Sequence, residues 1–174
     1  RDSFCGKFSI MDVFCQYGVP FTTLKPHTVH PSSDAFAAQL AQFAAVCRVA
    51  GGMRRFTVGA IGARTTAFKT VRFDEITLQR RGITVETLDL SEVFMRVRSV
   101  DNATGAYKDR AAHLAAYTSW KGVPDDTFHN LVKLSLVLDD LIAEFGMDAL
   151  ALRCWLELEK ELRVSPCVLL SDLN

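Results

Sequence analysis

The sequence lacks any surplus of charge. Among its 174 residues, 20 lysine and arginine side chains are balanced by 20 aspartate and glutamate side chains, so the formal net charge is zero. Proteins that bind nucleic acids or anionic membrane surfaces usually carry an excess of positive charge on one face. The sequence also has no apolar run long enough to span a bilayer and no signal segment at its start. We therefore expect neither nucleic acid nor membrane as a partner.

Cysteine is sparse and irregularly spaced. The five cysteines include no Cys-x-x-Cys pair, which argues against a disulfide framework and against a structural zinc site. Most of them stand inside apolar runs, so we expect reduced, buried thiols and a cytoplasmic location. No serine stands in a Gly-x-Ser-x-Gly motif, which excludes the nucleophile elbow of an α/β-hydrolase.

Apolar residues are plentiful, at 49% of the chain, which is enough for a sizeable core. Short apolar runs alternate with longer segments of helical spacing. The runs predict core strands at residues 56–61, 84–89, 149–154 and 167–170, and the segments between and before them predict helices at residues 34–50, 91–98, 106–120, 125–145 and 156–162. This alternation predicts an α/β domain with a doubly wound, Rossmann-like parallel sheet in three layers.

The first residues predict a separate part of the protein. A helix is expected at residues 8–17 and a short strand at 21–24, followed by a linker at 26–31 that contains two prolines. We expect residues 1–31 to be the remnant of a preceding domain with its linker. Residues 32–174 would form a middle α/β domain that runs into a truncated next segment. Because the last expected strand has no covering helix after it, we expect an internal piece of a longer protein.

The loop after the strand at 56–61 is a candidate ligand site. Ligands of open parallel sheets bind beyond the carboxyl ends of the strands, and this loop leaves such an end. It carries the cation of Arg64, the ring of Phe68 and the hydroxyl of Thr70. An arginine donates hydrogen bonds to hydroxyl groups, and a phenylalanine can close a site from water. The alternative is a loop that packs on its own domain.

Three segments share their pattern with one family. They read IGARTTAFKTVRFDE followed by VETLDLSEVF, then GVPFTTLKPHTVHPSSDAFAAQLAQFAAVCRVAGGMR, and ALRCWLELEKELRVSPCVLLSDLN. They resemble, in that order, the loop of the middle domain, the entry into that domain and the start of the metal-binding part of sugar isomerases related to L-fucose isomerase and L-arabinose isomerase. The resemblance implies an aldose–ketose isomerase that acts on a deoxyhexose or pentose. It also implies a divalent metal and a homo-oligomer when the protein is full length.

The resemblance assigns the chemistry to Glu157. The segment 154–157 matches a Cys-x-x-Glu pattern of the family, whose glutamate binds the metal and takes part in proton transfer. Oxygen ligands suit manganese, which is the expected ion, with magnesium as the alternative. The other ligands would lie beyond Asn174, so the chain alone is expected to be inert. The alternative is a carboxylate near a helix N-terminus, favoured by the helix dipole, beside Glu159 and Glu161.

The resemblance also implies a sugar-binding role for Arg64, Phe68, Thr70 and Trp155. The family loop lies near the substrate or a neighbouring subunit, although Lys69 departs from the small amide of relatives. Trp155 is expected either as an apolar wall against a sugar ring or as a packing residue of the core. For Arg153 we favour a structural ion pair with an acid such as Asp148.

Two other functions stay open. The first is an α/β domain that binds a sugar without chemistry. The second is a nucleotide-binding oxidoreductase domain. In it, Gly59 and Gly62 would belong to the phosphate-binding loop, and Asp89 would contact the ribose. That pattern lacks the third glycine. Asp89 can equally cap the following helix, whose start we otherwise assign to Ser91.

Overall fold

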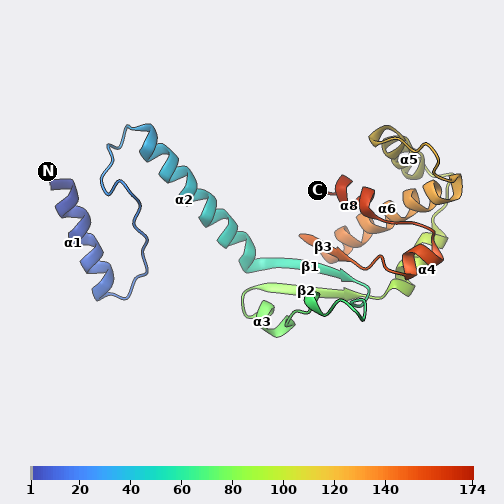
Figure 1. Cartoon of the computed structure of the whole chain (residues 1–174), viewed down its shortest axis with the longest axis horizontal. Helices are drawn as coiled ribbons and strands as arrows, with labels where there is room; N and C mark the ends of the chain where they lie inside the picture. The colour runs from blue at the N-terminus through green and yellow to red at the C-terminus, as the bar shows by residue number, and fades with distance from the viewer. Residues whose placement is uncertain (1) are drawn as a thin grey trace. The chain divides into compact units, whose positions relative to one another are not determined.

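The computed structural model describes residues 2–174, and the chain divides into two compact units, Arg1–Gly52 and Met53–Asn174. The first unit contains α1 (Asp2–Gln16) and α2 (Asp34–Gly52) (Figure 1). The hydroxyl of Ser33 caps α2, since it accepts a hydrogen bond from the backbone amide of Phe36 at 3.2 Å. The strand predicted at residues 21–24 is wrong for this unit, because these residues have no strand partner.

The second unit contains every strand found in residues 2–174. It begins with the short helix η1 (Met53–Arg55). The elements that follow are β1 (Phe56–Ile61), η2 (Lys69–Val71), α3 (Glu75–Gln79), β2 (Ile83–Leu88), α4 (Leu90–Ser99), α5 (Gly105–Tyr117), α6 (Asp125–Phe145), β3 (Ala149–Leu152), α7 (Glu157–Glu161) and α8 (Cys167–Asp172).

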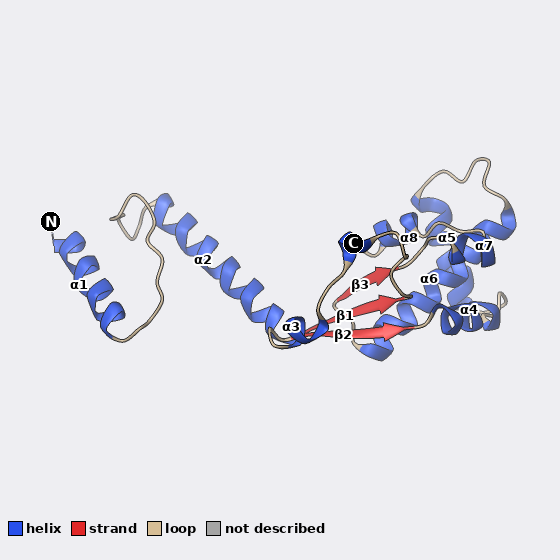
Figure 2. Cartoon of the chain, turned by 60° about the horizontal axis from the view of Figure 1, so that its bottom comes forward, coloured by secondary structure: helices blue, strands red, loops and turns tan. Residues whose placement is uncertain are grey.

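The three strands form one parallel sheet in the order β2-β1-β3 (Figure 2). Val58 in the central strand lies opposite Val85 in β2 and Ala149 in β3. The parallel pairing predicted for these strands is therefore confirmed. The connection from β1 to β2 runs through the loop that contains η2 and then through α3. The connection from β2 to β3 runs through α4, α5 and α6.

The core lies on one face of this sheet. Fully buried side chains come from β1 and from each of the three longer helices of the unit: Ile61, Val93, Leu114 and Leu138. Gly59 makes room on this face, because a Cβ there would lie 2.2 Å from Met147 Sδ. The opposite face is open in part, since Ala149 and Ala151 are exposed. The molecule is thus an α/β protein with a small parallel sheet.

Residues 167–170 form a helix, so the prediction of a fourth strand there is wrong. They belong to α8, where Leu169 is buried. Polar contacts attach α8 to α5: Asp172 lies 3.2 Å from Arg110 and 2.6 Å from His113 Nε2. His113 is exposed, and its contact with Asp172 is one of the links between the two helices. An apolar run of four residues fits a strand or a buried helical turn equally well, and only tertiary packing decides between them.

The cysteines are unpaired, as the sequence predicts, but most of them are not buried. All five thiols are free, as predicted. Four of them are exposed, contrary to the expectation of buried thiols: Cys5, Cys15, Cys47 and Cys167. Across residues 2–174, none of the helices combines the length and the apolar character that crossing a membrane requires.

Candidate functional site

The carboxyl ends of all three strands meet at one edge of the sheet, because the strands are parallel. Ile61 at the end of β1 lies opposite Leu88 of β2 and Leu152 of β3. Gly62 turns the chain there with a φ of +79°, and a Cβ at this position would lie 2.9 Å from Leu90 Cγ. The loops that leave the strand ends therefore begin side by side, and the candidate residues lie on them.

Two of the predicted sugar-binding residues meet at this edge. The ring centroids of Phe68 and Trp155 lie 5.1 Å apart, with an interplanar angle of 56°. The Thr65 hydroxyl donates a hydrogen bond to the Trp155 carbonyl at 3.3 Å. Trp155 is 49% exposed, so it is not a core residue. We call the cavity beside these rings the aromatic hollow; its volume is about 290 Å³, and it is lined by Thr65, Phe68, Val71, Leu152, Arg153, Cys154 and Trp155.

Arg64 and Thr70 lie on the same loop but outside the aromatic hollow. The guanidinium of Arg64 donates to the carbonyl oxygens of Thr65 and Thr66, at 3.3 and 3.1 Å. It thereby holds the conformation of its own loop. Thr70 is exposed within η2. The structure thus brings together Phe68 and Trp155, but not the other two residues.

Glu157 lies in a second cavity at the same edge, which we call the Glu157 hollow. Its volume is about 290 Å³, and it is lined by Gly62, Ala63, Asp89, Leu90, Ser91, Phe94, Arg153 and Glu157. Oε2 of Glu157 lies 2.8 Å from Arg153 Nη2 and accepts a hydrogen bond from the Leu156 amide at 2.9 Å. The carboxylate of Glu157 therefore has a close structural partner in Arg153.

Arg153 is the residue that joins the two hollows, since it lines both. Besides its ion pair with Glu157, its Nε donates to the Trp155 carbonyl at 2.8 Å. The structural ion pair expected for Arg153 is therefore present, but the acid is Glu157 and not Asp148, whose carboxylate accepts a hydrogen bond from the Thr57 amide at 2.8 Å. A signal for the true partner was present in the sequence, where Arg153 and Glu157 stand four residues apart.

Asp89 caps α4 at the border of the Glu157 hollow. Its Oδ1 accepts a hydrogen bond from the Ser91 backbone amide at 2.7 Å. Hydrogen bonds from Ser91, first from its side chain and then from its backbone, lower the pKa of Asp89 below its ordinary value of 3.8. The assignment of the helix start to Ser91 is therefore wrong, and the alternative of a capping Asp89 is confirmed.

The side chains at this edge do not by themselves fit a metal ion. Within the part of the chain that the structure describes, no three histidine, cysteine, aspartate or glutamate residues lie close enough to hold one. The Glu157 carboxylate also forms an ion pair with the guanidinium of Arg153. A divalent metal would need further ligands and the release of Glu157 from Arg153.

Comparison with protein families adds an independent observation on the first unit. Residues 1–54 match the family model described as the N-terminal domain of fucose/sulfoquinovose isomerase. The match confirms the resemblance to the fucose isomerase family, but it assigns these residues to the N-terminal domain, whereas we expected residues 18–54 to be the entry into the middle domain. The match ends close to Gly52, where the two units divide, and the candidate site lies outside it. The predicted domain boundary at residue 31 stays a prediction. No curated protein matches the chain.

Proposed function

We propose that the chain is part of a metal-dependent aldose–ketose isomerase that acts on a deoxyhexose or pentose of the L-fucose or L-arabinose type. The match of residues 1–54 to an isomerase family supports the reaction class. The observation that carries the proposal for the second unit is the Phe68–Trp155 ring pair at the carboxyl edge of the sheet. Rings next to hydrogen-bonding groups suit a sugar, which has apolar faces and hydroxyl edges.

In this proposal the aromatic hollow holds the sugar. Trp155 forms an apolar wall, and Phe68 excludes water from the same side. Arg153 is placed between the two hollows and can donate to a sugar oxygen, as a guanidinium has five N–H groups. Arg64 and Thr70 would reach the sugar only if their loop changed conformation.

Glu157 is the proposed metal ligand and proton-transfer residue. A manganese ion, or magnesium in its place, would polarise the sugar oxygens when bound. Since the residues around Glu157 do not complete a coordination sphere, the remaining ligands would come from segments outside this sequence. We therefore propose that these 174 residues are inert alone and that the complete isomerase is a cytoplasmic homo-oligomer. In it, further helices would cover the open face of the sheet and complete the doubly wound, three-layer fold.

A domain that binds a sugar without chemistry is the second candidate. The Arg153–Glu157 ion pair favours it, because a carboxylate neutralised by a neighbouring cation is a poor metal ligand. The nucleotide-binding alternative has less support. Gly59 is explained by its contact with Met147, and Asp89 is engaged as a helix cap.

Sugar binding by the aromatic hollow can be measured on this chain. L-Fucose and L-arabinose should each perturb the NMR signals of the Phe68 and Trp155 rings. Trp155→Ala and Phe68→Ala should abolish that response. Phe73→Ala is the matched control, because Phe73 is 57% exposed on the same loop but does not line the hollow. A response that survives Trp155→Ala, or that disappears in Phe73→Ala, would contradict the assignment.

The chemistry requires the full-length protein. There, Glu157→Gln keeps the shape of the side chain but removes its charge, so isomerase activity should fall about 10²- to 10⁴-fold while the protein stays folded. Full activity of that variant would reject Glu157 as the catalytic residue. Aldose-to-ketose turnover by the 174-residue chain with added manganese would reject the proposed inactivity.

A further inference from the structure

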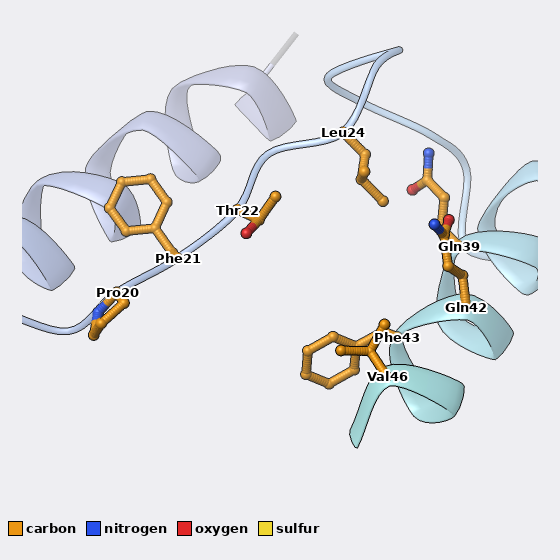
Figure 3. Close-up of a pocket in the computed structure, with 8 residues that line it drawn as sticks. All are labelled: Pro20, Phe21, Thr22, Leu24, Gln39, Gln42, Phe43 and Val46. Atoms are coloured by element: carbon orange, nitrogen blue, oxygen red, sulfur yellow. The ribbon is translucent and has the colours of Figure 1, made fainter. Parts of the chain in front are cut away.

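Two features outside the candidate site differ in what they reveal about a partner. The first is a hollow of about 390 Å³ in the first unit, where uncharged side chains gather (Figure 3). Its lining consists of Pro20, Phe21, Thr22, Leu24, Gln39, Gln42, Phe43 and Val46. Such a lining does not distinguish one apolar partner from another. The second feature is a group of charged side chains at the amino ends of β1 and β2, whose chemistry is more specific.

Four exposed arginines gather at these strand ends. We call them the arginine cluster: Arg54, Arg55, Arg80 and Arg81. The first pair belongs to η1, directly before β1, and the second pair lies in the turn between α3 and β2 (Figure 2). The two pairs are adjacent, because the Phe56 amide donates a hydrogen bond to the Gly82 carbonyl at 3.1 Å. The approach is close, since a Cβ on Gly82 would lie 2.7 Å from the Cα of Arg54.

The arginine cluster has no counter-charge in the described part of the chain. None of its four side chains forms an ion pair with another of the residues 2–174. Asp148, which directly precedes β3, accepts a hydrogen bond from the Thr57 amide instead. All arginines after residue 81 do form ion pairs: Arg96, Arg98, Arg110, Arg153 and Arg163. The cluster therefore differs from the other arginines of its unit.

Unpaired charges of one sign at close range destabilise a fold. Adjacent residues stand about 3.8 Å apart along the backbone, and salt at physiological concentration screens charges only over about 8 Å. The C-terminus of α3 supplies at most about half a negative charge near the second pair. The repulsion within the cluster is thus incompletely compensated. Local features that work against stability are typical of sites that bind a ligand.

The remaining charge of the protein selects the kind of anion. The whole chain has 20 basic and 20 acidic side chains, so the residues outside the cluster contain 16 basic against 20 acidic ones, a net charge of −4. A long polyanion that follows the surface would meet this negative charge, whereas a compact anion would meet only the cluster. Guanidinium groups bind phosphate oxygens through two parallel N–H donors, so several of them suit adjacent phosphate groups.

We propose that the arginine cluster binds a compact ligand with two or more adjacent phosphate groups. The phosphates can belong to an inorganic polyphosphate or to a nucleotide, since both present the same chain of oxygens. The site lies at the amino edge of the sheet, whereas the aromatic hollow and the Glu157 hollow lie at the carboxyl edge. A ligand of the cluster would therefore not compete with a sugar. The proposal does not depend on the isomerase chemistry.

Isothermal titration calorimetry of the 174-residue protein provides the first test. At about 0.15 M salt, inorganic tripolyphosphate should bind at least about tenfold more tightly than inorganic phosphate, because it contacts several guanidinium groups at once. Equal affinities would show an adventitious ion only and would overturn the proposal. Adenosine triphosphate separates the two sources. Tighter binding than that of tripolyphosphate would identify a nucleotide, and equal or weaker binding would identify the phosphate chain alone.

Substitutions provide the second test. Arg54→Gln and Arg81→Gln each remove one charge from a different pair, so each should weaken tripolyphosphate binding about 10- to 100-fold. Arg163→Gln is the matched control, because it changes the net charge equally at a side chain that is 75% exposed. Unchanged binding in both cluster variants, or equal weakening in Arg163→Gln, would overturn the proposal.

Thermal melts without ligand separate a binding role from a structural one. Because repulsion decreases, the melting temperatures of Arg54→Gln and Arg81→Gln should equal or exceed that of the unmodified protein. Tripolyphosphate should raise the melting temperature of the unmodified protein and of Arg163→Gln, and much less that of the two cluster variants. Lower melting temperatures of both cluster variants without ligand would assign these arginines a structural role and contradict the proposal.

Discussion

Asp89 caps the start of α4 at the edge of the sheet where the candidate site lies. Because its folded-state pKa is lowered, its charged form stabilises the folded protein at pH values above 3.8. This contribution should be lost as the pH falls through the lower folded-state pKa. Asp89→Asn keeps a hydrogen-bond acceptor but cannot titrate, so its urea midpoint should change less between about pH 7 and about pH 3 than that of the unmodified protein. An identical change in both proteins would contradict the capping role.

Leu138 is one of the buried residues on the apolar face of α6. Its side chain is fully buried among residues of the core. Leu138→Ala should therefore lower the free energy of unfolding by about 2 to 5 kcal/mol, measured by urea denaturation. Leu173→Ala is the matched control at a position that is 40% exposed, where the loss should stay within about 1 kcal/mol. Equal losses at both positions would mean that the stripe does not form the core.

Glu157 shows why the sequence predicts the location of the candidate site better than its geometry. The strand before it is recognisable from its apolar run, and the rule that parallel strands end at one edge places the following turn there. The partner of the carboxylate depends on the path of the turn between Arg153 and Glu157, which no periodic pattern describes. The contact of Phe68 with Trp155 likewise depends on how two distant loops pack.

At the scale of elements, the turn between α3 and β2 depends on a glycine. Gly82 has a φ of +89°, and a Cβ there would lie 2.3 Å from the backbone oxygen of Arg54. Gly82→Ala should therefore lower the free energy of unfolding by about 1 to 3 kcal/mol or more. Gly105→Ala is the matched control, because it begins α5 in open space, and should stabilise the protein by about 0.4 to 1 kcal/mol. Comparable thermal melts of the two variants would contradict this assignment.

The elements that could be predicted are those whose surroundings lie within the chain. β1, β2 and β3 are apolar runs that pair with one another, and α6 carries a long stripe that its own unit buries. Residues 21–24 have strand character but no neighbour in the structure. Residues 167–170 are too short for their pattern to separate strand from helix, and the contacts of α8 with α5 decide. The local sequence pattern therefore does not predict the secondary structure of a segment when contacts with distant residues determine it.

At the scale of the whole molecule, the two units differ in what holds them together. Every residue of the buried core belongs to Met53–Asn174. No residue whose burial is described in Arg1–Gly52 is buried. A compact body with its own core can fold alone, whereas exposed helices without a core unfold locally at little cost. The units should therefore differ strongly in stability even though one chain connects them.

A protein that comprises residues 53–174 alone should then fold. It contains the complete core and all three strands, so it should show a cooperative thermal transition close to that of the whole chain. A peptide of residues 1–52 should show helical circular dichroism that decreases gradually on heating, without a cooperative transition. Circular dichroism melts of the three proteins under the same conditions provide the comparison. Failure of residues 53–174 to fold would show that the first unit supplies contacts on which the core depends, and that the two units form one domain.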